Sequence, residues 1–290
     1  MLYPWLYFRR PYFILVLLTP SLLITNNDQP ITIIRIFAGR PATSMAAPEQ
    51  SINRMKYPVF KDLIIFESED YVVVNKPPFL ATLEDRTPNT TNLLKIARQY
   101  NPDLQACHRL DKDTSGCLVF AKNAEAYRHL SMQFEHRQVY KVYHAVAWGV
   151  HKFEDELVNR AILPNAKGVA HLNPKGKPAE TYFTTLESFA RHTLVECVPV
   201  TGRLHQIRVH LAFLNAPIVG DSLYGGENVY LSNLKRGFNL KKDTEELPLI
   251  KRFALHSFNI GFTLLDGEPV KIEAPYPKDF AVLVKQLRAH

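Results

Sequence analysis

The sequence predicts an α+β fold, with a mixed but mostly antiparallel sheet and helices on its flanks. Runs of β-branched and aromatic residues outnumber the segments in which apolar residues recur at helical spacing. The regular alternation of strand and helix that builds parallel sheets is missing from the chain. The 290 residues suffice for one large or two small domains with a substantial core.

Strands are predicted where short runs of β-branched and aromatic residues are bounded by turn residues. Two such runs flank the acidic stretch Glu67–Asp70 and predict a hairpin, and a second hairpin is predicted around Asp266–Gly267. Leu63–Phe66 and Tyr71–Asn75 are the two strands of the first hairpin. The strands predicted between the two hairpins are Cys117–Ala121, Val139–Trp148, Thr181–Leu186 and Thr193–Pro199.

Helical spacing of apolar residues predicts four helices. Thr91 and Asn123 each stand directly before one of these segments and carry side chains of the type that caps a helix. The residues expected to face inward are Leu93, Leu94, Ile96 and Ala97 in the first helix, and Tyr127, Leu130 and Phe134 in the second, which ends near Glu135. The third helix, His205–Leu214, is expected to turn Ile207, Leu211 and Leu214 inward, and Asp279–Arg288 is the fourth. Gly225–Leu247 lacks periodicity and is expected to be a mobile insertion near the substrate surface.

Residues 1–44 differ from the rest of the chain and are interpreted as a leader outside the folded domain, which we expect to span residues 57–290. The apolar run after Arg9-Arg10 imitates a signal peptide or membrane anchor, but it is too short to span a bilayer and Pro20 interrupts it. We interpret the leader as translated upstream sequence, with Met45 or Met55 as the true start. A genuine N-terminal extension is the alternative.

Charge and cysteine content limit the classes of function. The formal net charge of +7 has the sign expected for a protein with a polyanionic partner, although charge alone is weak support for one. Three cysteines without a Cys-x-x-Cys pair indicate neither a disulfide framework nor a zinc site, so each is expected to be a small buried residue in a reducing compartment. His205 and His210 are five residues apart, which is not the spacing of a helical metal pair, and we expect no metal and no cofactor.

The most informative segment is the nine-residue run from His108 to Gly116, which leads directly into a predicted buried strand. Asp, Ser and Gly are common turn residues, so an ordinary turn is one interpretation. A calcium loop is another, since Asp111 and Asp113 match its first half. That loop requires a bidentate Glu at its twelfth position, where this chain has Lys122. A polar loop at the end of a strand is instead typical of a rigidly held functional site.

The run His108-Arg109-Leu110-Asp111-Lys112-Asp113-Thr114-Ser115-Gly116 resembles the signature of the RluA-type pseudouridine synthases, with Asp111 at the position of the family's catalytic aspartate. Further landmarks follow the family's order: Asn75-Lys76-Pro77-Pro78 after Tyr71–Val74, Lys141-Val142-Tyr143-His144-Ala145, Thr201–His210, Pro217–Gly225 and Leu255-His256. The resemblance covers roughly residues 57–277. It implies the pseudouridine synthase fold with a central RNA-binding cleft. Some relatives carry an additional small RNA-binding domain (an S4 domain) before the catalytic one, and we expect none here because too few residues separate Met45 from the first predicted strand to hold it.

The function that the resemblance implies is the isomerisation of a specific uridine in rRNA or tRNA, with base flipping and without a cofactor. We therefore expect a cytoplasmic enzyme, acting as a monomer, with RNA as its partner and no membrane association. Which RNA and which uridine are modified is left open by the sequence.

The resemblance also assigns roles to single residues. Asp111 is the expected nucleophile, attacking either C1′ of the sugar or C6 of the uracil. Arg208 is the expected partner that keeps this carboxylate charged, although an RNA phosphate contact is its ordinary alternative. Tyr143 is the expected active-site tyrosine, as stacking platform, hydrogen-bond donor or base. Arg109 is expected to fill the space left by the flipped uridine, and the other residues expected to bind substrate are His108, Arg203 and His205.

Two other functions are compatible with parts of the sequence. A catalytically inactive RNA-binding or ribosome-assembly protein could retain the fold, but it is expected to have lost at least one of Asp111, Tyr143 and Arg208, which are all present. A hydrolase that uses Asp111 with a histidine lacks a Gly-x-Ser-x-Gly elbow or another supporting motif.

Overall fold

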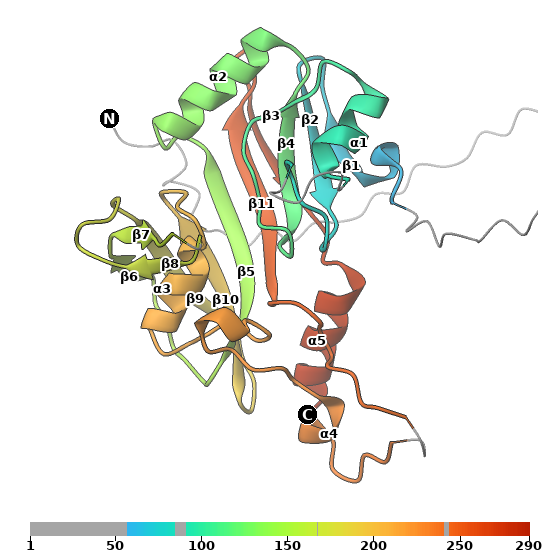
Figure 1. The fold of residues 1–290 in the computed structure, drawn as a ribbon, viewed down its shortest axis with the longest axis vertical. Coiled ribbons are helices and arrows are strands. Elements are labelled where there is room, and N and C mark those ends of the chain that lie inside the picture. The colour runs from blue at the N-terminus through green and yellow to red at the C-terminus, as the bar shows by residue number, and fades with distance from the viewer. Residues whose placement is uncertain (1–56, 85–90, 167, 241–243) are drawn as a thin grey trace, which may run out of the picture. The chain divides into compact units, whose positions relative to one another are not determined.

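A ten-stranded mixed sheet organises the fold, in the order β1-β2-β4-β11-β5-β10-β9-β6, with β12 paired to β11 and β3 paired to β4 (Figure 1). Every pair in it is antiparallel except β4 with β11, so the predicted fold class is confirmed. The strands of this sheet are β1 (Ile64–Glu67), β2 (Tyr71–Lys76), β3 (Gln105–Ala106), β4 (Ser115–Ala121), β5 (Tyr140–Trp148), β6 (Glu156–Asn159), β9 (Glu180–Ser188), β10 (His192–Pro199), β11 (Leu255–Thr263) and β12 (Pro269–Glu273). A separate hairpin joins β7 (Ile162–Pro164) to β8 (Ala170–Leu172).

This computed structural model describes residues 57–84, 91–166, 168–240 and 244–290. The predicted leader, residues 1–44, lies outside the described residues. Residues from Pro58 to His290 form one unit. Its helices are α1 (Leu93–Tyr100), α2 (Ala124–Glu135), α3 (Gln206–Phe213), α4 (Leu231–Leu234) and α5 (Lys278–Ala289), with 3-10 turns η2 (Phe60–Leu63) and η3 (Ser222–Tyr224). No helix among the described residues is long and apolar enough to cross a membrane.

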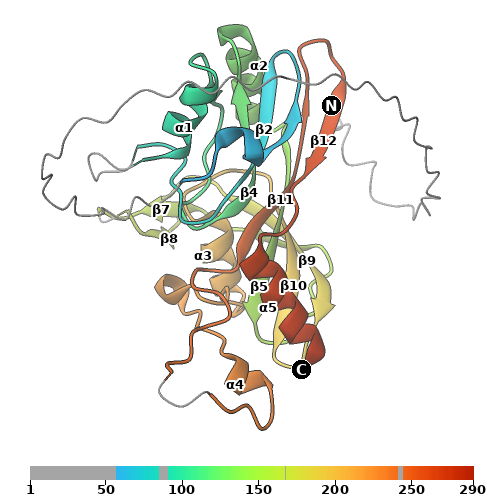
Figure 2. The same ribbon diagram turned by 90° about the vertical axis from the view of Figure 1, so that its right-hand side faces the viewer.

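The apolar runs of β2 and β4 are continuous because both faces of the sheet are covered here. Val72 and Val74 pack with α1, whereas Tyr71 and Val73, which point to the other face, pack with Leu130 of α2. Further along the sheet, residues of α3 and α5 share a second core with β5 and β10. In Figure 2, α1, α3 and the β7–β8 hairpin lie on the same side of the sheet.

The one parallel pair places two distant segments together. His256 of β11 pairs with Ser115 of β4, and Ser257 pairs with Gly116, so the N-terminal ends of both strands lie side by side in the sheet. Gly116 has a φ of 111°, and a Cβ there would lie 2.1 Å from the carbonyl oxygen of Ser257. Glycine is therefore required both by the backbone conformation and by this close approach. The loop before β4 is held against the segment before β11 as a result.

Most predicted elements are present, including the Asn123 cap, the hairpin around Asp266–Gly267 and the closing helix. The cap of α1 was predicted one residue too early, since the side chain of Asn92 accepts the Lys95 N–H at 2.9 Å. Tyr127 is exposed, not inward, because the core beneath α2 is filled by its neighbour Leu130. Cys107 is half-buried, whereas it was expected to be buried. Strands β3, β6, β7 and β8 and the two 3-10 turns were not predicted, and neither was α4, which lies within Gly225–Leu247 and packs against α5.

Candidate active site

The loop that carries Asp111, residues 108–114, is fastened to its surroundings along its whole length. The Leu110 side chain is buried in the core next to α1, and its backbone N–H donates to the Thr82 hydroxyl at 3.2 Å. The same hydroxyl donates to the Leu110 carbonyl at 3.0 Å. At the start of the loop, His108 Nε2 accepts the Val119 N–H at 3.1 Å. Asp111 therefore projects from a backbone that has little freedom to move.

Two buried cations complete this support. Lys76 Nζ donates to the carbonyls of Pro77, Leu80 and Lys112 at 3.0, 2.8 and 3.0 Å, which matches the three protons of an ammonium group. Burial lowers the pKa of Lys76 to about 7. The ammonium of Lys76 ties the end of β2 to the Asp111 loop, so Lys76 has a structural role at this site.

Arg252 supports the loop from the other side. Its guanidinium donates to the Asp113 carbonyl at 2.9 Å and to the Ser115 hydroxyl at 3.2 Å, and it forms an ion pair with Asp279 of α5 at 2.8 Å. The Ser115 hydroxyl also lies 2.9 Å from His256 Nδ1. Arg252 and His256 thus connect the Asp111 loop to β11 and α5.

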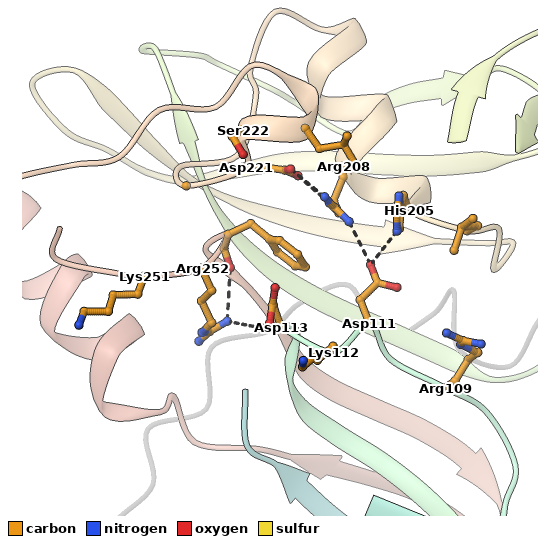
Figure 3. Close-up of a pocket in the computed structure, with 14 residues that line it drawn as sticks. Arg109, Asp111, Lys112, Asp113, His205, Arg208, Asp221, Ser222, Lys251 and Arg252 are labelled. Atoms are coloured by element: carbon orange, nitrogen blue, oxygen red, sulfur yellow. Dashed lines mark hydrogen bonds and ion pairs between the residues drawn. The ribbon is translucent and has the colours of Figure 1, made fainter. Parts of the chain in front are cut away.

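The Asp111 carboxylate faces Arg208 of α3 and His205, the residue before this helix (Figure 3). Its Oδ2 lies 3.5 Å from Arg208 Nη1 and 4.0 Å from His205 Nε2, and its side chain is 25% exposed. The predicted pairing of Asp111 with Arg208 is therefore present. Since the carboxylate keeps solvent access, a molecule that enters the cavity can reach it.

Arg208 is held mainly by another carboxylate. Asp221 accepts from Arg208 Nε at 2.6 Å and from Nη2 at 2.8 Å, and both side chains are buried. The guanidinium also lies between the rings of Phe253, at 4.2 Å, and Tyr224, at 4.9 Å. Burial alone would lower the pKa of Arg208, but hydrogen bonding to Asp221 and the nearby negative charges raise it. A permanently charged and immobile guanidinium is thus presented to Asp111.

His205 stands at the N-cap of α3 with a φ of 53°, a left-handed conformation that few non-glycine residues adopt. Its Nδ1 lies 2.8 Å from the Tyr224 hydroxyl. Burial lowers the pKa of His205 below its ordinary 6.5, although the Asp111 carboxylate opposes this shift. The imidazole is therefore neutral at neutral pH, and its unusual backbone turns it toward the cavity.

Two adjoining cavities, of about 380 and 360 Å³, meet at Asp111. The smaller one is also lined by Tyr143 from β5, by Leu255 and by Ile207, which gives it the apolar and aromatic surface suited to a planar base. Burial raises the pKa of Tyr143 well above its ordinary 10.0, so the phenol stays protonated at neutral pH.

The structure brings most of the predicted site residues to these cavities. Arg109 and His205 line both cavities, as do Asp111 and Arg208, while Arg203 lines the smaller one. His108 lines neither cavity; its ring packs on Phe134 with centroids 5.0 Å apart. No group of three or more His, Cys, Asp or Glu side chains placed to hold a metal ion occurs in the part of the chain that the structure describes.

Asp221, Tyr224 and Phe253 were not identified as site residues from the sequence. Asp221 and Tyr224 belong to the landmark Pro217–Gly225, which pointed to this segment without giving any side chain a role. An aspartate followed by Ser and preceded by Gly is typical of a turn, and nothing in the sequence pairs it with Arg208. Their function becomes visible only through their contacts with the guanidinium.

Comparison with known proteins agrees with this geometry. Residues 70–213 match the RNA pseudouridylate synthase family. The chain is 36% identical over 247 residues to the ribosomal large subunit pseudouridine synthase C of Vibrio vulnificus (strain CMCP6), which covers 83% of this chain and 74% of that protein. It is 33% identical over 235 residues to the ribosomal large subunit pseudouridine synthase D of Haemophilus influenzae (strain ATCC 51907 / DSM 11121 / KW20 / Rd), covering 78% of this chain and 71% of that protein.

Among solved structures, the human RNA pseudouridylate synthase domain containing 4 superimposes with a TM-score of 0.58 at 25% identity, over 79% of this chain and 95% of that chain. Fold, sequence relatives and the arrangement around Asp111 lead to the same assignment. The chain belongs to the RluA-type RNA pseudouridylate synthases, a family of isomerases.

Proposed function

We propose that this enzyme converts a uridine of large-subunit ribosomal RNA into pseudouridine, with Asp111 as the nucleophile. The observation that carries the proposal is the solvent-accessible Asp111 carboxylate, 3.5 Å from a guanidinium that is itself fixed by Asp221. A charged carboxylate can act as a nucleophile without an adjacent base, whereas the neighbouring hydroxyls would need one.

The reaction exchanges one glycosidic bond for another. The bond between N1 and C1′ breaks, a bond between C5 and C1′ forms, C5 loses its proton and N1 gains one, so no redox partner is needed. Asp111 bonds covalently to C1′ of the sugar or to C6 of the uracil while the base turns. Arg208 stabilises the carboxylate before the attack and when it is released.

Tyr143 supports the base during this exchange. Its ring lies in the same cavity as Asp111, and a uracil can stack on it. Because burial keeps its hydroxyl protonated, Tyr143 acts as a hydrogen-bond partner of the base and not as a phenolate.

The uridine reaches the cavity by leaving its stack, at a cost of a few kcal/mol. Arg109 is exposed, adjoins Asp111 and lines both cavities, so it is positioned to occupy the space that the flipped base leaves in the RNA. Arg203 and His205 line the smaller cavity from the turn before α3, where they are positioned to contact a bound nucleotide.

The target is proposed from the relatives, whose names refer to the large ribosomal subunit. The test is to delete the gene, treat the RNA with a pseudouridine-specific reagent and map the modified positions by sequencing. We expect one or a few large-subunit positions to lose the signal and to regain it with the purified enzyme. A loss confined to tRNA would refute the target, and no loss in any RNA would refute the activity.

A further inference from the structure

Lys141 is a cation that lines the substrate cavity and has no partner within the described part of the chain. It lies on β5, two residues before Tyr143, so both side chains point to the same face of the strand. Lys141 lines the smaller cavity and is half-buried, and its Nζ is not among the fully buried polar atoms. Among the described residues, no hydrogen bond or ion pair to its ammonium is found. An unpaired cation in the half-buried wall of a cavity is available to an anionic ligand, and the reduced exposure to solvent strengthens such a contact.

The charges around Lys141 select the kind of ligand. Two titratable groups outside the cavity interact with the charge of Lys141: Arg137, two residues after α2, and His108, which burial keeps neutral with a pKa of about 3. The charged and titratable side chains that line the same cavity are Arg109, Asp111, Tyr143, Arg203, His205 and Arg208. Asp111 is the single carboxylate among them and already faces Arg208. The cavity therefore has an excess of positive charge that an anion would balance.

We propose that Lys141 binds a phosphodiester group of the RNA next to the uridine that stacks on Tyr143. This inference rests on the proposed function. Two residues along a strand span about 7 Å, and both side chains line the same cavity. A nucleotide whose base stacks on Tyr143 would therefore bring its sugar–phosphate backbone within reach of the long Lys141 side chain. A uracil carbonyl could accept a hydrogen bond from the Lys141 ammonium, but this contact would leave the excess positive charge unbalanced.

The pH dependence of RNA binding follows from this contact. Burial, with a contribution from Arg137, lowers the pKa of Lys141 to about 8. A bound phosphate favours the ammonium form, so RNA binding is strongest below pH 8 and weakens as the pH rises through this value. Arginine at the same position stays charged throughout this range and removes the pH dependence.

The test compares Lys141→Gln and Lys141→Arg with the original enzyme in binding to large-subunit rRNA transcribed in vitro. Lys152→Gln, which removes an exposed lysine outside both cavities, is the matched control. We expect Lys141→Gln to lose about tenfold in affinity at low salt and to reduce the salt slope, the dependence of log affinity on log salt, by about 0.7–0.9. Between pH 7 and 9.5 the original enzyme should lose affinity, whereas both Lys141 variants should follow a flatter curve.

Other roles of Lys141 give different results. A weaker affinity with an unchanged salt slope would indicate a contact to the uracil, and a defect confined to the rate of the bound complex would indicate proton transfer; either overturns the proposal. If the glutamine variant does not fold, Lys141→Arg alone tests the proposal. RNA binding by Lys141→Arg with the same pH dependence as the original enzyme would refute the contact between Lys141 and a phosphate. RNA that remains unmodified by the original enzyme would instead refute the proposed function.

Discussion

The Arg208 guanidinium contacts two carboxylates, and Asp221 is closer to it than Asp111. The two contacts to Asp221 are hydrogen bonds of 2.6 and 2.8 Å, whereas the nearest atom of Asp111 lies at 3.5 Å. Asp221 and the flanking rings already fix the guanidinium. The positive charge of Arg208 therefore stabilises the Asp111 carboxylate without a short hydrogen bond between them. A nucleophile that must leave its partner to attack benefits from this arrangement.

Asp221→Asn tests whether this fixation matters. The amide has the shape of the carboxylate but lacks its charge and one acceptor, so Arg208 should shift relative to Asp111. We expect single-turnover isomerisation to slow by about 100-fold, the order expected for a misplacement of about 1 Å at an active site. RNA affinity should change little. The exposed Asp266→Asn variant is the charge-matched control, and an Asp221→Asn enzyme as fast as this control would contradict the role of Asp221.

The sequence predicts the principal residues of the site but not their supports. Asp111, Tyr143 and Arg208 lie around one cavity, as the resemblance implied. Asp221 could not be placed because it contacts Arg208 only after a turn of the backbone that no periodicity encodes. Lys76 could not be placed either, since its partners are backbone carbonyls, which every residue has. Arg252 could not be placed because it combines such carbonyls with a carboxylate 27 residues away, Asp279.

Among the elements, the parallel contact of β4 with β11 decides where the Asp111 loop lies. Gly116 permits it, because the Ser257 carbonyl occupies the space that a side chain would need. A glycine at position 116 is consistent with such a close approach, but it is equally consistent with an ordinary turn, so the sequence alone does not predict the contact. The close approach of two strands 141 residues apart in sequence becomes evident only in the folded chain.

Gly116→Ala should therefore destabilise the protein and displace the Asp111 loop. Gly267→Ala is the matched control, because Gly267 also has a positive φ, 91°, but no atom lies within 4 Å of its would-be Cβ. We expect about 1–2 kcal/mol of strain in both variants and a further loss in Gly116→Ala alone. Thermal unfolding and single-turnover rates measure the two effects, and equal behaviour of the variants would contradict the steric explanation.

Long, periodic elements were predicted better than short ones. α2 was found with its cap and its end because Asn123 and the apolar spacing agree. β6 was missed because Val158 is its single buried residue, which leaves no alternation to detect. The cap of α1 was misplaced by one residue. The N–H groups of Leu93 and Leu94, the first two of the helix, donate to the carbonyls of Ala81 and Thr82. These contacts come from a segment before the helix, and the local sequence around the cap does not reveal them.

For the whole molecule, the site depends on segments that the chain brings together from far apart. The Asp111 loop is supported by Lys76, 36 residues before Lys112, and by Arg252, 139 residues after Asp113. These supports all lie within Pro58–His290. The central chemistry is accordingly expected to need this unit only.

A shortened chain that begins at Met45 tests this expectation together with the interpretation of residues 1–44. We predict that it remains soluble and melts at the same temperature as the full chain, because the contacts that hold the site are retained. It should also modify RNA at the same rate. An N-terminus at Met1 in mass spectrometry of the native protein, or a loss of activity on shortening, would contradict the interpretation.

The nucleophilic role of Asp111 is tested most directly by Asp111→Asn, measured for single-turnover pseudouridine formation and RNA affinity in the same preparation. Asp113→Asn, in the same loop and with the same change of charge, is the control and should retain turnover. We predict that Asp111→Asn abolishes turnover while its affinity for RNA stays within about tenfold, or about 1.4 kcal/mol. Pseudouridine formed by an Asp111→Asn preparation that is free of the original enzyme would contradict the mechanism.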